Sequence, residues 1–599
     1  MLFYYNSLDE KCKSTIGGIV VDKPITFNVY TTEVKDCSLK ITKDGENTVA
    51  YAMQKTNFGY SCSLKITSVG LYFYGFEFGG DFYGQGYDYT AEKNSCEKYR
   101  LTVYREDYET PERIKGGIIY QIFPDRFCRV GDVNANGRLL HERWDETPVW
   151  KFTEKGEILN NDFFGGNFKG IESKLDYLKS LGVTAIYLNP ITKAYSNHRY
   201  DTGDYMKIDE LLGTETDFKS LVAAAKEKNV EIILDGVFNH TGADSKYFNK
   251  YGSYADVGAY QSRSSKYYEW YNFIKYPDVY ESWWGFKSLP TLNKKNEEYR
   301  EFVSGENGVI SHYMDFGISG YRLDVVDELP DDMVAEIRNA VKRKNKDAIL
   351  IGEVWENATD KIAYGVRRKY FLGNELDSVM NYPLYNSSID FVLNKKGLAF
   401  KRTVSDMIDN YPKPALDCLM NVTGTHDTVR LVTRLSGLTA NSREEMAITR
   451  IAENEMPAVI EKVKKVLLIN YTVSGVPSVY YGDELGMQGF KDPFNRQTFT
   501  GEDKYGLLEF VRRLGKIRRS IDLFKDGDLT FEYADNETVA YSRKRGDRKV
   551  YILINLAEKD VPITFDGELY ELLTNEKHVD GYTLQKDGVA VLYDELITN

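Results

Sequence analysis

The sequence predicts an α/β fold: a (β/α)8 TIM barrel with an inserted subdomain after its third strand, flanked by N-terminal and C-terminal β-sandwich domains. Three observations predict this fold. Short apolar runs alternate with segments of helical period through the middle of the chain. Polar residues follow four of these runs, at the point where a strand would end. Alternating runs rich in β-branched and aromatic residues occur towards both termini.

Residues 1–112 are predicted to form the N-terminal β-sandwich, because runs 25–30, 38–41 and 70–78 alternate between turn signals. The barrel is expected over residues 113–519. Its strands are predicted at 118–123, 183–188, 230–234, 321–326, 349–351, 379–385, 418–422 and 476–481. Helices are predicted between them, including 168–181, 218–228 and 331–344.

The interval 241–302 follows the third predicted strand and is too long and too aromatic for a simple loop. We expect it to be an inserted subdomain that closes one wall of a cleft. From residue 520 onward the sequence again has the pattern of short β-strands, as in the apolar, β-rich run 550–555. Residues 520–599 are therefore predicted to form the C-terminal β-sandwich.

The composition and net charge of the chain limit the kinds of partner that it is expected to bind. The 599 residues carry a net charge of −13, which argues against nucleic acid or an anionic membrane as the main partner. The start of the chain lacks the features of a signal peptide, and no apolar run is long enough to span a membrane. We therefore expect a cytoplasmic protein with reduced cysteines that acts on a neutral or small substrate. Aromatic residues make up 14% of the chain, which suits stacking on sugar rings.

The stretch 320–328 carries Arg322 and Asp324 two positions apart, so a strand would point both side chains to the same side. A guanidinium beside a carboxylate lowers the pKa of that carboxylate and keeps it ionised, as a nucleophile at a sugar carbon requires. Considered alone, this pair is better explained as a salt bridge at the end of a buried strand, because such ion pairs are common. The other strand ends favour a catalytic reading.

Four predicted strands deliver carboxylates or imidazoles to one rim of the barrel, where catalytic groups of such barrels lie. The chain has only six histidines, and three of them fall at rim positions. If these residues had structural roles only, their common location at one rim would require several independent coincidences. The rim residues are Asp235 and His240 after strand three, Arg322 and Asp324 after strand four, Glu353 and Trp355 after strand five, and His426 and Asp427 after strand seven, together with His198.

These four stretches resemble the signature regions of glycoside hydrolase family 13, the α-amylase family, over about residues 115–515. Three further stretches, 182–190, 289–293 and 475–484, also resemble sequences of this family. The chain is similar to the neopullulanases, cyclomaltodextrinases and maltogenic amylases, because residues 289–293 (LPTLN) are close to the MPKLN stretch of that subgroup. The N-terminal domain sits where the subgroup has a starch-binding-like, dimer-forming domain.

The resemblance implies three catalytic residues. Asp324 would be the nucleophile and form a β-glucosyl-enzyme. Glu353 would protonate the leaving oxygen and then deprotonate water, which calls for a raised pKa. Asp427 would bind the 2- and 3-hydroxyls of the sugar.

The resemblance also implies a set of substrate-binding residues. Arg322 would keep Asp324 ionised, His240 and His426 would donate to ring hydroxyls, and Tyr200 would stack under the cleaved sugar. The remaining members of this set are His198, Asp235, Trp355, Asp327, Glu328, Asp492 and Arg496.

One departure from the subgroup concerns the residues after the nucleophile. The subgroup reads VANE there, whereas this chain has Val325, Val326, Asp327 and Glu328. Because Val326 is larger than Ala, we expect less space in the sites that receive the leaving sugars. Ionised Asp327 only accepts hydrogen bonds, so a sugar hydroxyl that needs a donor there would lose its partner. The expected result is α-1,4 cleavage as the main activity, with α-1,6 cleavage minor.

No cofactor is expected to be required, but the subgroup often binds Ca²⁺ near the first barrel loop. Stretches 131–136 and 165–167 resemble its ligand stretches, with Asp132, Asn136, Gly165 and Asn167 as candidate ligands. Asn167 replaces a usual Asp, and fewer carboxylates mean weaker binding. A polar Asn/Gly turn is the alternative.

The leading prediction is a retaining endo-type hydrolase of α-1,4 bonds in maltodextrins, cyclodextrins or pullulan, working as a homodimer on α-glucan oligosaccharides. An α-glucosidase or oligo-1,6-glucosidase of the same family is one alternative. A non-catalytic glucan-binding or transporter-associated barrel is another, although such barrels lose the catalytic carboxylates and this chain keeps Asp324, Glu353 and Asp427.

Overall fold

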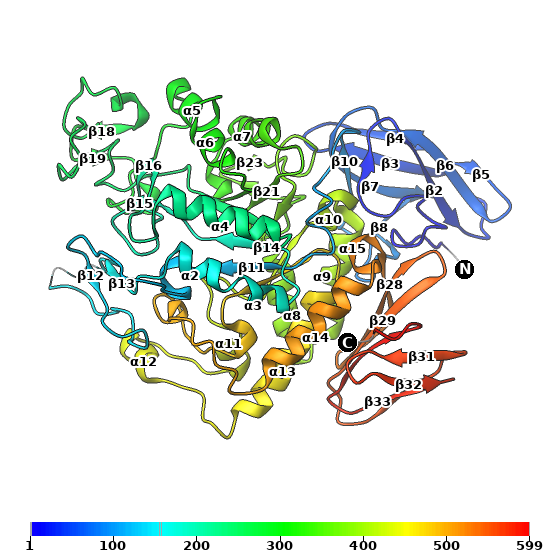
Figure 1. The fold of residues 1–599 in the computed structure, drawn as a ribbon. Coiled ribbons are helices and arrows are strands. Elements are labelled where there is room, and N and C mark those ends of the chain that lie inside the picture. The colour runs from blue at the N-terminus through cyan, green and yellow to red at the C-terminus, as the bar shows by residue number, and fades with distance from the viewer. Residues whose placement is uncertain (1–2, 155, 157, 598–599) are drawn as a thin grey trace.

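The computed structural model describes residues 3–154, 156 and 158–597. Eight parallel strands form the central sheet in the order β24-β21-β20-β17-β14-β11-β26-β25, and a parallel bridge from Met380 to Met420 joins its two ends (Figure 1). The predicted barrel is confirmed. The strands are β11 (Ile119–Ile122), β14 (Ala185–Leu188), β17 (Glu231–Gly236), β20 (Gly320–Leu323), β21 (Ile349–Gly352), β24 (Ser378–Val379), β25 (Met420–Val422) and β26 (Val476–Tyr480).

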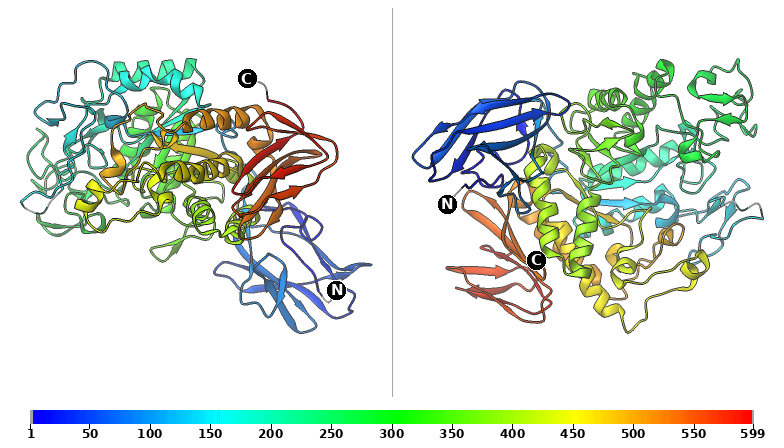
Figure 2. Two further views of the ribbon diagram at one scale, coloured as in Figure 1. Left: turned by 90° about the horizontal axis from the view of Figure 1, so that it is seen from below. Right: turned by 180° about the vertical axis from the view of Figure 1, so that it is seen from behind.

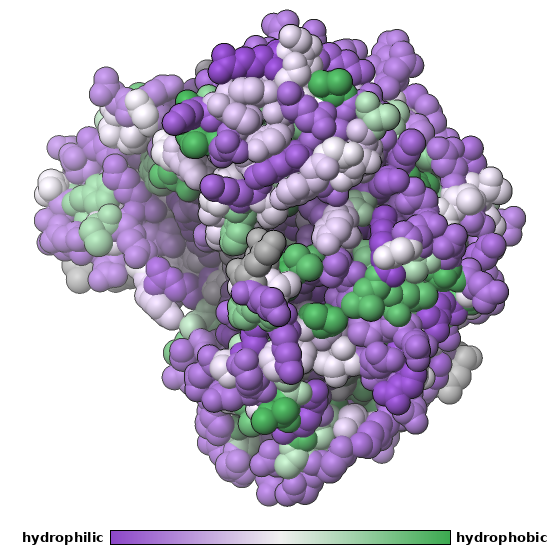
Figure 3. Space-filling view, turned by 90° about the vertical axis from the view of Figure 1, so that its left-hand side faces the viewer, coloured by the Kyte–Doolittle hydropathy of each residue, from purple (hydrophilic) through white to green (hydrophobic). Residues whose placement is uncertain are grey.

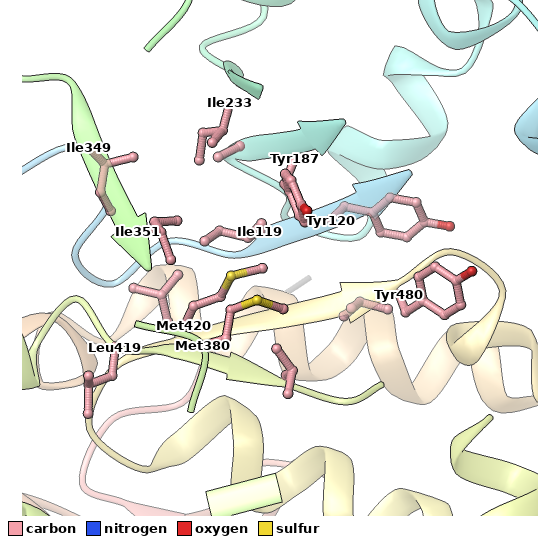
Figure 4. Close-up of a cluster of buried hydrophobic side chains, with 14 of the residues drawn as sticks. Ile119, Tyr120, Tyr187, Ile233, Ile349, Ile351, Met380, Leu419, Met420 and Tyr480 are labelled. Atoms are coloured by element: carbon pink, nitrogen blue, oxygen red, sulfur yellow. The ribbon is translucent and has the colours of Figure 1, made fainter. Parts of the chain in front are cut away.

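The barrel strands are short because a strand covered on both faces needs only a brief apolar run. Ile119, Ile233 and Ile351 are fully buried, and they point into the same packed core as Met380 and Met420 (Figure 4). The two methionine side chains lie close together where β24 and β25 meet, so they fill the seam at which the barrel closes.

Helices surround the barrel. One predicted helix and one predicted strand differ from the structure. The predicted helix 168–181 is divided at Lys174 into two short helices. The predicted strand 379–385 ends after Val379, because Asn381 caps a helix that begins at Tyr382 and has a proline in its first turn. The helices named below are α2 (Phe168–Ser173), α3 (Leu175–Ser180), α4 (Glu215–Glu227), α5 (Glu297–Ser304), α6 (Val309–Met314), α7 (Asp331–Lys344), α8 (Tyr382–Asn394), α9 (Gly397–Asn410), α13 (Met456–Thr472) and α14 (Leu507–Ser520).

The segment between β17 and α5 forms the insertion after the third strand. It carries the hairpin β18 (Phe273–Lys275) and β19 (Val279–Tyr280), packed by the buried rings of Phe248, Trp270 and Tyr271. Helix α5 packs on α6 and α7, so we place it with the barrel helices and end the insertion before Glu297. The insertion lies with β15 (Thr192–Ala194) and β16 (Thr202–Ile208) on the side of the molecule where β14 and β17 end.

Figure 3 views that side of the molecule directly and shows a hollow in its surface. Most residues around the hollow are hydrophilic. The two flanking β domains lie next to each other at the other end of the molecule (Figure 2). Helix α9 contacts both of them, through β10 (Tyr99–Tyr104) of the first and β27 (Asp528–Ala534) of the second. At its end, Asp409 forms a buried ion pair with Lys13 and accepts a hydrogen bond from Ser7.

The N-terminal β-rich domain has two sheets, which run β1-β10-β7-β3-β4 with β8 and β9 attached, and β2-β6-β5. Its strands are β1 (Ile19–Val20), β2 (Pro24–Tyr30), β3 (Cys37–Lys43), β4 (Thr48–Ala52), β5 (Gln54–Lys55), β6 (Gly59–Lys65), β7 (Gly70–Phe78), β8 (Asp81–Gln85), β9 (Ala91–Lys93) and β10 (Tyr99–Tyr104). All six cysteines of the chain are free.

The C-terminal β-rich domain has a six-stranded sheet, β27-β28-β29-β34-β31-β32, and the pair β30-β33. Its strands are β27 (Asp528–Ala534), β28 (Thr538–Arg545), β29 (Arg548–Asn555), β30 (Val561–Ile563), β31 (Glu568–Glu571), β32 (Glu576–Val579), β33 (Tyr582–Leu584) and β34 (Val589–Tyr593). Within residues 3–154, 156 and 158–597, we find no helix with the length and apolar character needed to cross a membrane.

Candidate active site

Arg322 is the centre of the site. Its Nη1 lies 2.8 Å from Oδ1 of Asp235 and 2.9 Å from Oδ1 of Asp324, and its Nη2 lies 2.6 Å from Oε2 of Glu353. The barrel register explains this geometry, because Arg322 pairs with Asp235 on β17 and with Ile351 on β21. Three neighbouring strands therefore bring three carboxyl groups to one guanidinium, and the predicted approach of Arg322 to Asp324 is confirmed.

The residue after Asp324 has an unusual backbone. Val325 has φ 39° and ψ 50°, in the left-handed region that a β-branched residue rarely adopts. This conformation aims its N–H at Oε2 of Glu353, at 2.9 Å. Strain of this kind persists where the surrounding structure over-determines it, commonly at functional sites. Here it fixes the distance between the ends of β20 and β21.

Glu353 is held at both oxygens. Oε2 faces Arg322 and Val325, and Oε1 accepts from Nε1 of Trp355 at 3.0 Å. The indole of Trp355 stacks on Tyr382, with ring centroids 3.7 Å apart, and is 43% exposed. Sequence reasoning missed Tyr382, because it lies in the segment predicted to be the sixth strand.

Asp427 lies across the site and is the most open of the four carboxylates, with its side chain 36% exposed. Oδ2 is 3.1 Å from Nε2 of His426, and Oδ1 is 3.4 Å from Nη2 of Arg496. Arg496 is in turn 2.8 Å from Asp492, so the predicted pair forms. An accessible carboxylate with a fixed orientation can accept hydrogen bonds from sugar hydroxyls.

Three histidines border the site, as the sequence predicted. Nδ1 of His426 lies 3.0 Å from Nε2 of Gln121 and 3.1 Å from Nδ2 of Asn189. Because both neighbours are amide donors, the ring proton belongs on Nε2, which faces Asp427. Burial lowers the pKa of His426, and the nearby Arg496 acts in the same direction, so the ring is neutral.

His198 is oriented in the same way. Its Nδ1 faces the hydroxyl of Ser196 and the N–H of Tyr200, which leaves the proton on Nε2. His240 stacks on Trp283 at 5.4 Å, and burial lowers its pKa to about 3. Within the described part of the chain, Nε2 of His240 has no hydrogen-bond partner. A buried polar atom without a partner is costly, so a sugar hydroxyl would satisfy it.

Asp235 corrects one expectation. Its side chain is fully buried, and its oxygens accept from Arg322, from Tyr187 at 2.6 Å and from Tyr200 at 2.7 Å. Asp235 therefore positions Arg322 and Tyr200 rather than contacting a sugar. The Tyr200 ring stacks against His426 with centroids 5.1 Å apart and lies beside Arg322.

Burial raises the pKa of the aspartates in the site. Burial raises the pKa of Asp427 to about 6, with Arg496 opposing and Glu353 reinforcing the shift. Burial also raises the pKa of Asp324, and Arg322 lowers it, in the direction that the sequence predicted, without cancelling the rise. Three carboxyl groups face the single Arg322 guanidinium, so its charge only partly offsets the burial of Asp324.

Two residues after the nucleophile do not line the site as expected. Val326 is fully buried, so its methyl groups cannot narrow a wall for the substrate. Asp327 accepts a hydrogen bond from Tyr370 and lies 3.1 Å from Nζ of Lys361. For Val326 the expectation that it shapes the leaving-group side is therefore wrong, whereas the Asp327 side chain is 22% exposed and is held by Tyr370 and Lys361. Glu328 accepts from Trp284 and Tyr364 at the surface.

The candidate calcium ligands do not fit a calcium site. Oδ1 of Asn167 caps α2 by accepting from Gly170, and its Nδ2 donates to Val130. Asp132 and Asn136 are exposed, and the Arg129 side chain lies beside Gly165 and donates from its guanidinium to the carbonyl oxygen of Phe164. A cation among these groups would meet donors and a positive charge instead of the oxygen ligands that Ca²⁺ requires.

Comparisons with known proteins show the family to which the chain belongs. Residues 121–521 match the model of the α-amylase catalytic domain. The chain is 36% identical over 528 residues to an amylopullulanase of Thermoanaerobacterium saccharolyticum, a match that covers 78% of this chain and 40% of that protein. It is 32% identical over 479 residues to a maltogenic α-amylase of Bacillus acidopullulyticus, covering 77% of this chain and 73% of that protein.

Among solved structures, the type III pullulan hydrolase from Thermococcus kodakarensis matches with a TM-score of 0.70 and 26% identity, over 98% of this chain and 100% of that one. This likeness extends over the flanking domains as well as the barrel. Fold and site together define a glycoside hydrolase barrel. The chain belongs to the α-amylase family, although it spans less than half the length of the amylopullulanases that it matches.

Proposed function

We propose that the protein is a retaining endo-type hydrolase of α-1,4-glucosidic bonds in soluble α-glucans. One observation carries the proposal: Asp324 and Glu353 contact the two terminal nitrogens of one guanidinium, and Asp427 faces them with an open carboxylate. Two carboxylates this close suit double displacement, which needs about 5–5.5 Å between them, rather than the wider gap that holds a water in inverting enzymes.

The residues supply each step of such a reaction. Asp324 attacks the anomeric carbon as Glu353 protonates the departing oxygen, and a glycosyl-enzyme forms on Asp324. Glu353, now ionised, removes a proton from water, which attacks the same carbon and releases Asp324. Asp427 holds two ring hydroxyls, and neutral His426 donates to one of them.

The substrate class follows from the family relatives. Two of them are named an amylopullulanase and a maltogenic α-amylase, and a solved relative is a pullulan hydrolase. We propose maltodextrins as the main substrates, with cyclodextrins and pullulan also cleaved and α-1,6 bonds cleaved more slowly. Trp355, half exposed beside the acid, offers a flat face for the departing sugar.

We also propose that the protein works in the cytoplasm and as a homodimer. Six free cysteines, three of them buried near the N-terminus, fit a reducing compartment. Light scattering at micromolar concentration tests the dimer, and fractionation of the native, untagged protein tests the location. A monomer, or a secreted protein, would contradict the respective proposal.

The experiment that tests the function is a product profile. Purified protein is incubated separately with maltohexaose, β-cyclodextrin and pullulan, and products are separated by anion-exchange chromatography. We expect short maltooligosaccharides from the first two and panose from pullulan. Release of glucose alone from chain ends would instead support an α-glucosidase, and binding without any cleavage would support a non-catalytic glucan-binding barrel.

A further inference from the structure

His141 lies between two carboxylates, outside the catalytic centre. It follows the short strand β12 (Leu139–Leu140), which pairs in parallel with β13 (Asp162–Phe163) on the same side of the molecule as the insertion (Figure 1). Nδ1 of His141 lies 2.7 Å from Oε2 of Glu146, and its Nε2 lies 3.0 Å from Oδ2 of Asp162. Both ring nitrogens are therefore held against carboxylate oxygens.

Only a ring with two protons can donate to both carboxylates. A neutral imidazole has a proton on one nitrogen, so its other nitrogen would turn a lone pair towards a carboxylate. Water could not relieve that contact, because the His141 side chain is only 9% exposed. The hydrogen bond with His141 lowers the pKa of Glu146, so this carboxylate is ionised. The oxygens of Asp162 also accept from the N–H of Val149 at 3.0 Å and from Nδ2 of Asn197 at 3.1 Å, so Asp162 needs no proton of its own.

The charges around the ring favour the same protonation state. Arg126 lies 3.8 Å from Asp162 but is closer to Asp125, at 2.7 Å. Arg143 lies 3.8 Å from Glu146, and its side chain is 73% exposed, so its charge is screened by water. A neutral ring would therefore leave the buried Asp162 with one cation that it shares with Asp125. The charged side chains that face the two carboxylates or pair with these cations, within the described residues, are Asp125, Arg126, Arg143 and Asp145.

Asp162 connects this arrangement to the catalytic site. Its Oδ1 and its carbonyl oxygen both accept from Nδ2 of Asn197, at 3.1 and 3.0 Å, and both residues are buried. Asn197 precedes His198, and its carbonyl oxygen accepts from Nη1 of Arg199, which has φ 62°. A residue in this left-handed conformation keeps it only where the surrounding structure holds it. His141 therefore acts on the position of His198 through Asp162 and Asn197.

Glu146 connects the same ring to the loop that follows β12. Its Oε1 accepts from the backbone N–H of Arg143 at 2.9 Å. Within this loop, Nε1 of Trp144 donates to the carbonyl oxygen of Phe499 at 2.9 Å. Phe499 follows Arg496 by three positions, so the loop packs on the segment that pairs with Asp427.

We propose that His141 is a positioning residue that carries two ring protons and bridges Glu146 to Asp162. The bridge fixes residues 142–149 beside the catalytic site. Through Asp162 it also fixes the segment that carries His198. The bridge itself is independent of the proposed hydrolase function, and only its effect on turnover rests on that function.

The first test measures the protonation state of the ring. Nitrogen-15 NMR of histidine-labelled protein at neutral pH distinguishes a ring with two protonated nitrogens from a neutral ring with one bare nitrogen. The chain has six histidines, and the signal that is lost in His141→Gln identifies His141. We expect two protonated nitrogens in the unmodified protein. In Glu146→Gln we expect one, because the new amide can donate to Nδ1.

A bare nitrogen on His141 in the unmodified protein would overturn the bridge. If His141→Gln does not fold, the signal that changes in Glu146→Gln identifies the ring instead. Glu146 suits this purpose because its side chain is 31% exposed and its replacement by Gln keeps an acceptor for the N–H of Arg143.

The second test measures the positioning of the loop by amide hydrogen exchange and mass spectrometry. Peptides that cover residues 142–149 should exchange about ten- to a hundredfold faster in His141→Gln, which is the factor expected when a hydrogen bond to a charged group is lost. In Glu146→Gln the neutral ring keeps both contacts, so the exchange rate should match that of the unmodified protein.

Turnover gives a third readout. We expect kcat/KM on maltohexaose to fall about tenfold in His141→Gln, because a displaced binding residue misplaces the substrate, and to change less than about twofold in Glu146→Gln. His578→Gln is the matched control, since His578 lies in the C-terminal domain and faces the carboxylate of Glu576 at 3.9 Å; it should change neither exchange nor turnover. Unchanged exchange and unchanged kcat/KM in His141→Gln would overturn the positioning role. Absence of any hydrolysis by the unmodified protein would overturn the proposed function instead, while the spectra and the exchange rates would still test the bridge.

Discussion

The backbone N–H of Val325 donates to Oε2 of Glu353 at 2.9 Å, so the residue after the nucleophile holds the acid. This contact, made by a valine in the left-handed region, couples the ends of two adjacent barrel strands. Movement of Asp324 would therefore also move Glu353. The positions of the two catalytic carboxylates are therefore linked through the backbone.

Removal of any one of three carboxylates should nearly abolish turnover. Asp324→Asn, Glu353→Gln and Asp427→Asn are each expected to lower kcat on maltohexaose by about three or more orders of magnitude. The reason is that each group makes its main contribution in the transition state. Circular dichroism and thermal melting confirm that the variants fold. Near-normal kcat in any folded variant would refute its assignment.

The first product should retain the α configuration. Double displacement inverts the anomeric carbon twice, and the shared Arg322 contact brings Asp324 and Glu353 close enough for it. Proton NMR within the first minutes of maltotetraose hydrolysis measures the anomer before mutarotation. Initial β-anomer would contradict the mechanism, as would a carboxyl separation of roughly 9 Å in an experimental structure.

The acid limb of the pH profile should depend on Arg496. Burial raises the pKa of Asp427 to about 6, and the Arg496 guanidinium opposes that rise. The acid limb of kcat/KM should therefore fall near pH 6 as an apparent value for the coupled carboxyl groups. Arg496→Gln removes the opposing charge, so the limb should move to higher pH. Arg496→Lys keeps the charge and should move it less; a shift to lower pH in Arg496→Gln would contradict the electrostatic explanation.

The double variant Val326→Ala/Asp327→Asn should leave bond preference unchanged. Val326 is fully buried and Asp327 is engaged by Tyr370 and Lys361, so we expect neither residue to contact the substrate. The ratio of panose to maltotetraose hydrolysis should match that of the unmodified protein, whereas the free energy of unfolding should fall by about 2 kcal/mol because of the cavity at position 326. A change in the ratio would show that one of these side chains reaches the sugar.

The buried ion pair between the N-terminal domain and α9 should be sensitive to loss of one partner. Lys13 and Asp409 are both fully buried, so Lys13→Met leaves an unpaired carboxylate. We expect the free energy of unfolding in urea to fall by about 3–5 kcal/mol. Lys13→Met/Asp409→Asn removes both charges and keeps an acceptor for Ser7, so it should recover a large part of the loss. Equal stability of Lys13→Met and the unmodified protein would contradict this.

Much of the barrel and of the site could be predicted, because both depend on short-range patterns. An apolar run of four to six residues bounded by polar residues indicates a buried strand wherever it occurs. Side chains at the carboxyl ends of parallel strands share one rim whatever the loops between them do. Arg322, Asp324, Glu353 and Asp427 could therefore be placed together before any contact was known. The strand predicted at 379–385 is wrong beyond Val379 for a local reason too. Asn381 caps helix α8, so the strand contains only Ser378 and Val379.

Contacts between segments far apart in the chain could not be predicted in this way. Gln121 on β11 and Asn189, which directly follows β14, orient His426. The sequence offered only a hint of this, because one lies inside a predicted strand and the other directly after one. The direction in which Asp235 and Val326 point depends on register and packing density, which one strand alone does not encode.

By itself, the sequence determined the class of fold and the rim on which the carboxylates lie, because strand periodicity and strand-end position follow from neighbouring residues. Only the tertiary structure decided that Asp235 is buried, that Asp324 and Glu353 share the nitrogens of Arg322, and that Trp284 and Tyr364 meet over Glu328. The physical reason is that burial and shared hydrogen-bond partners depend on which strands and loops become neighbours. That choice is made by the packing of the whole barrel against its insertion and its N-terminal domain.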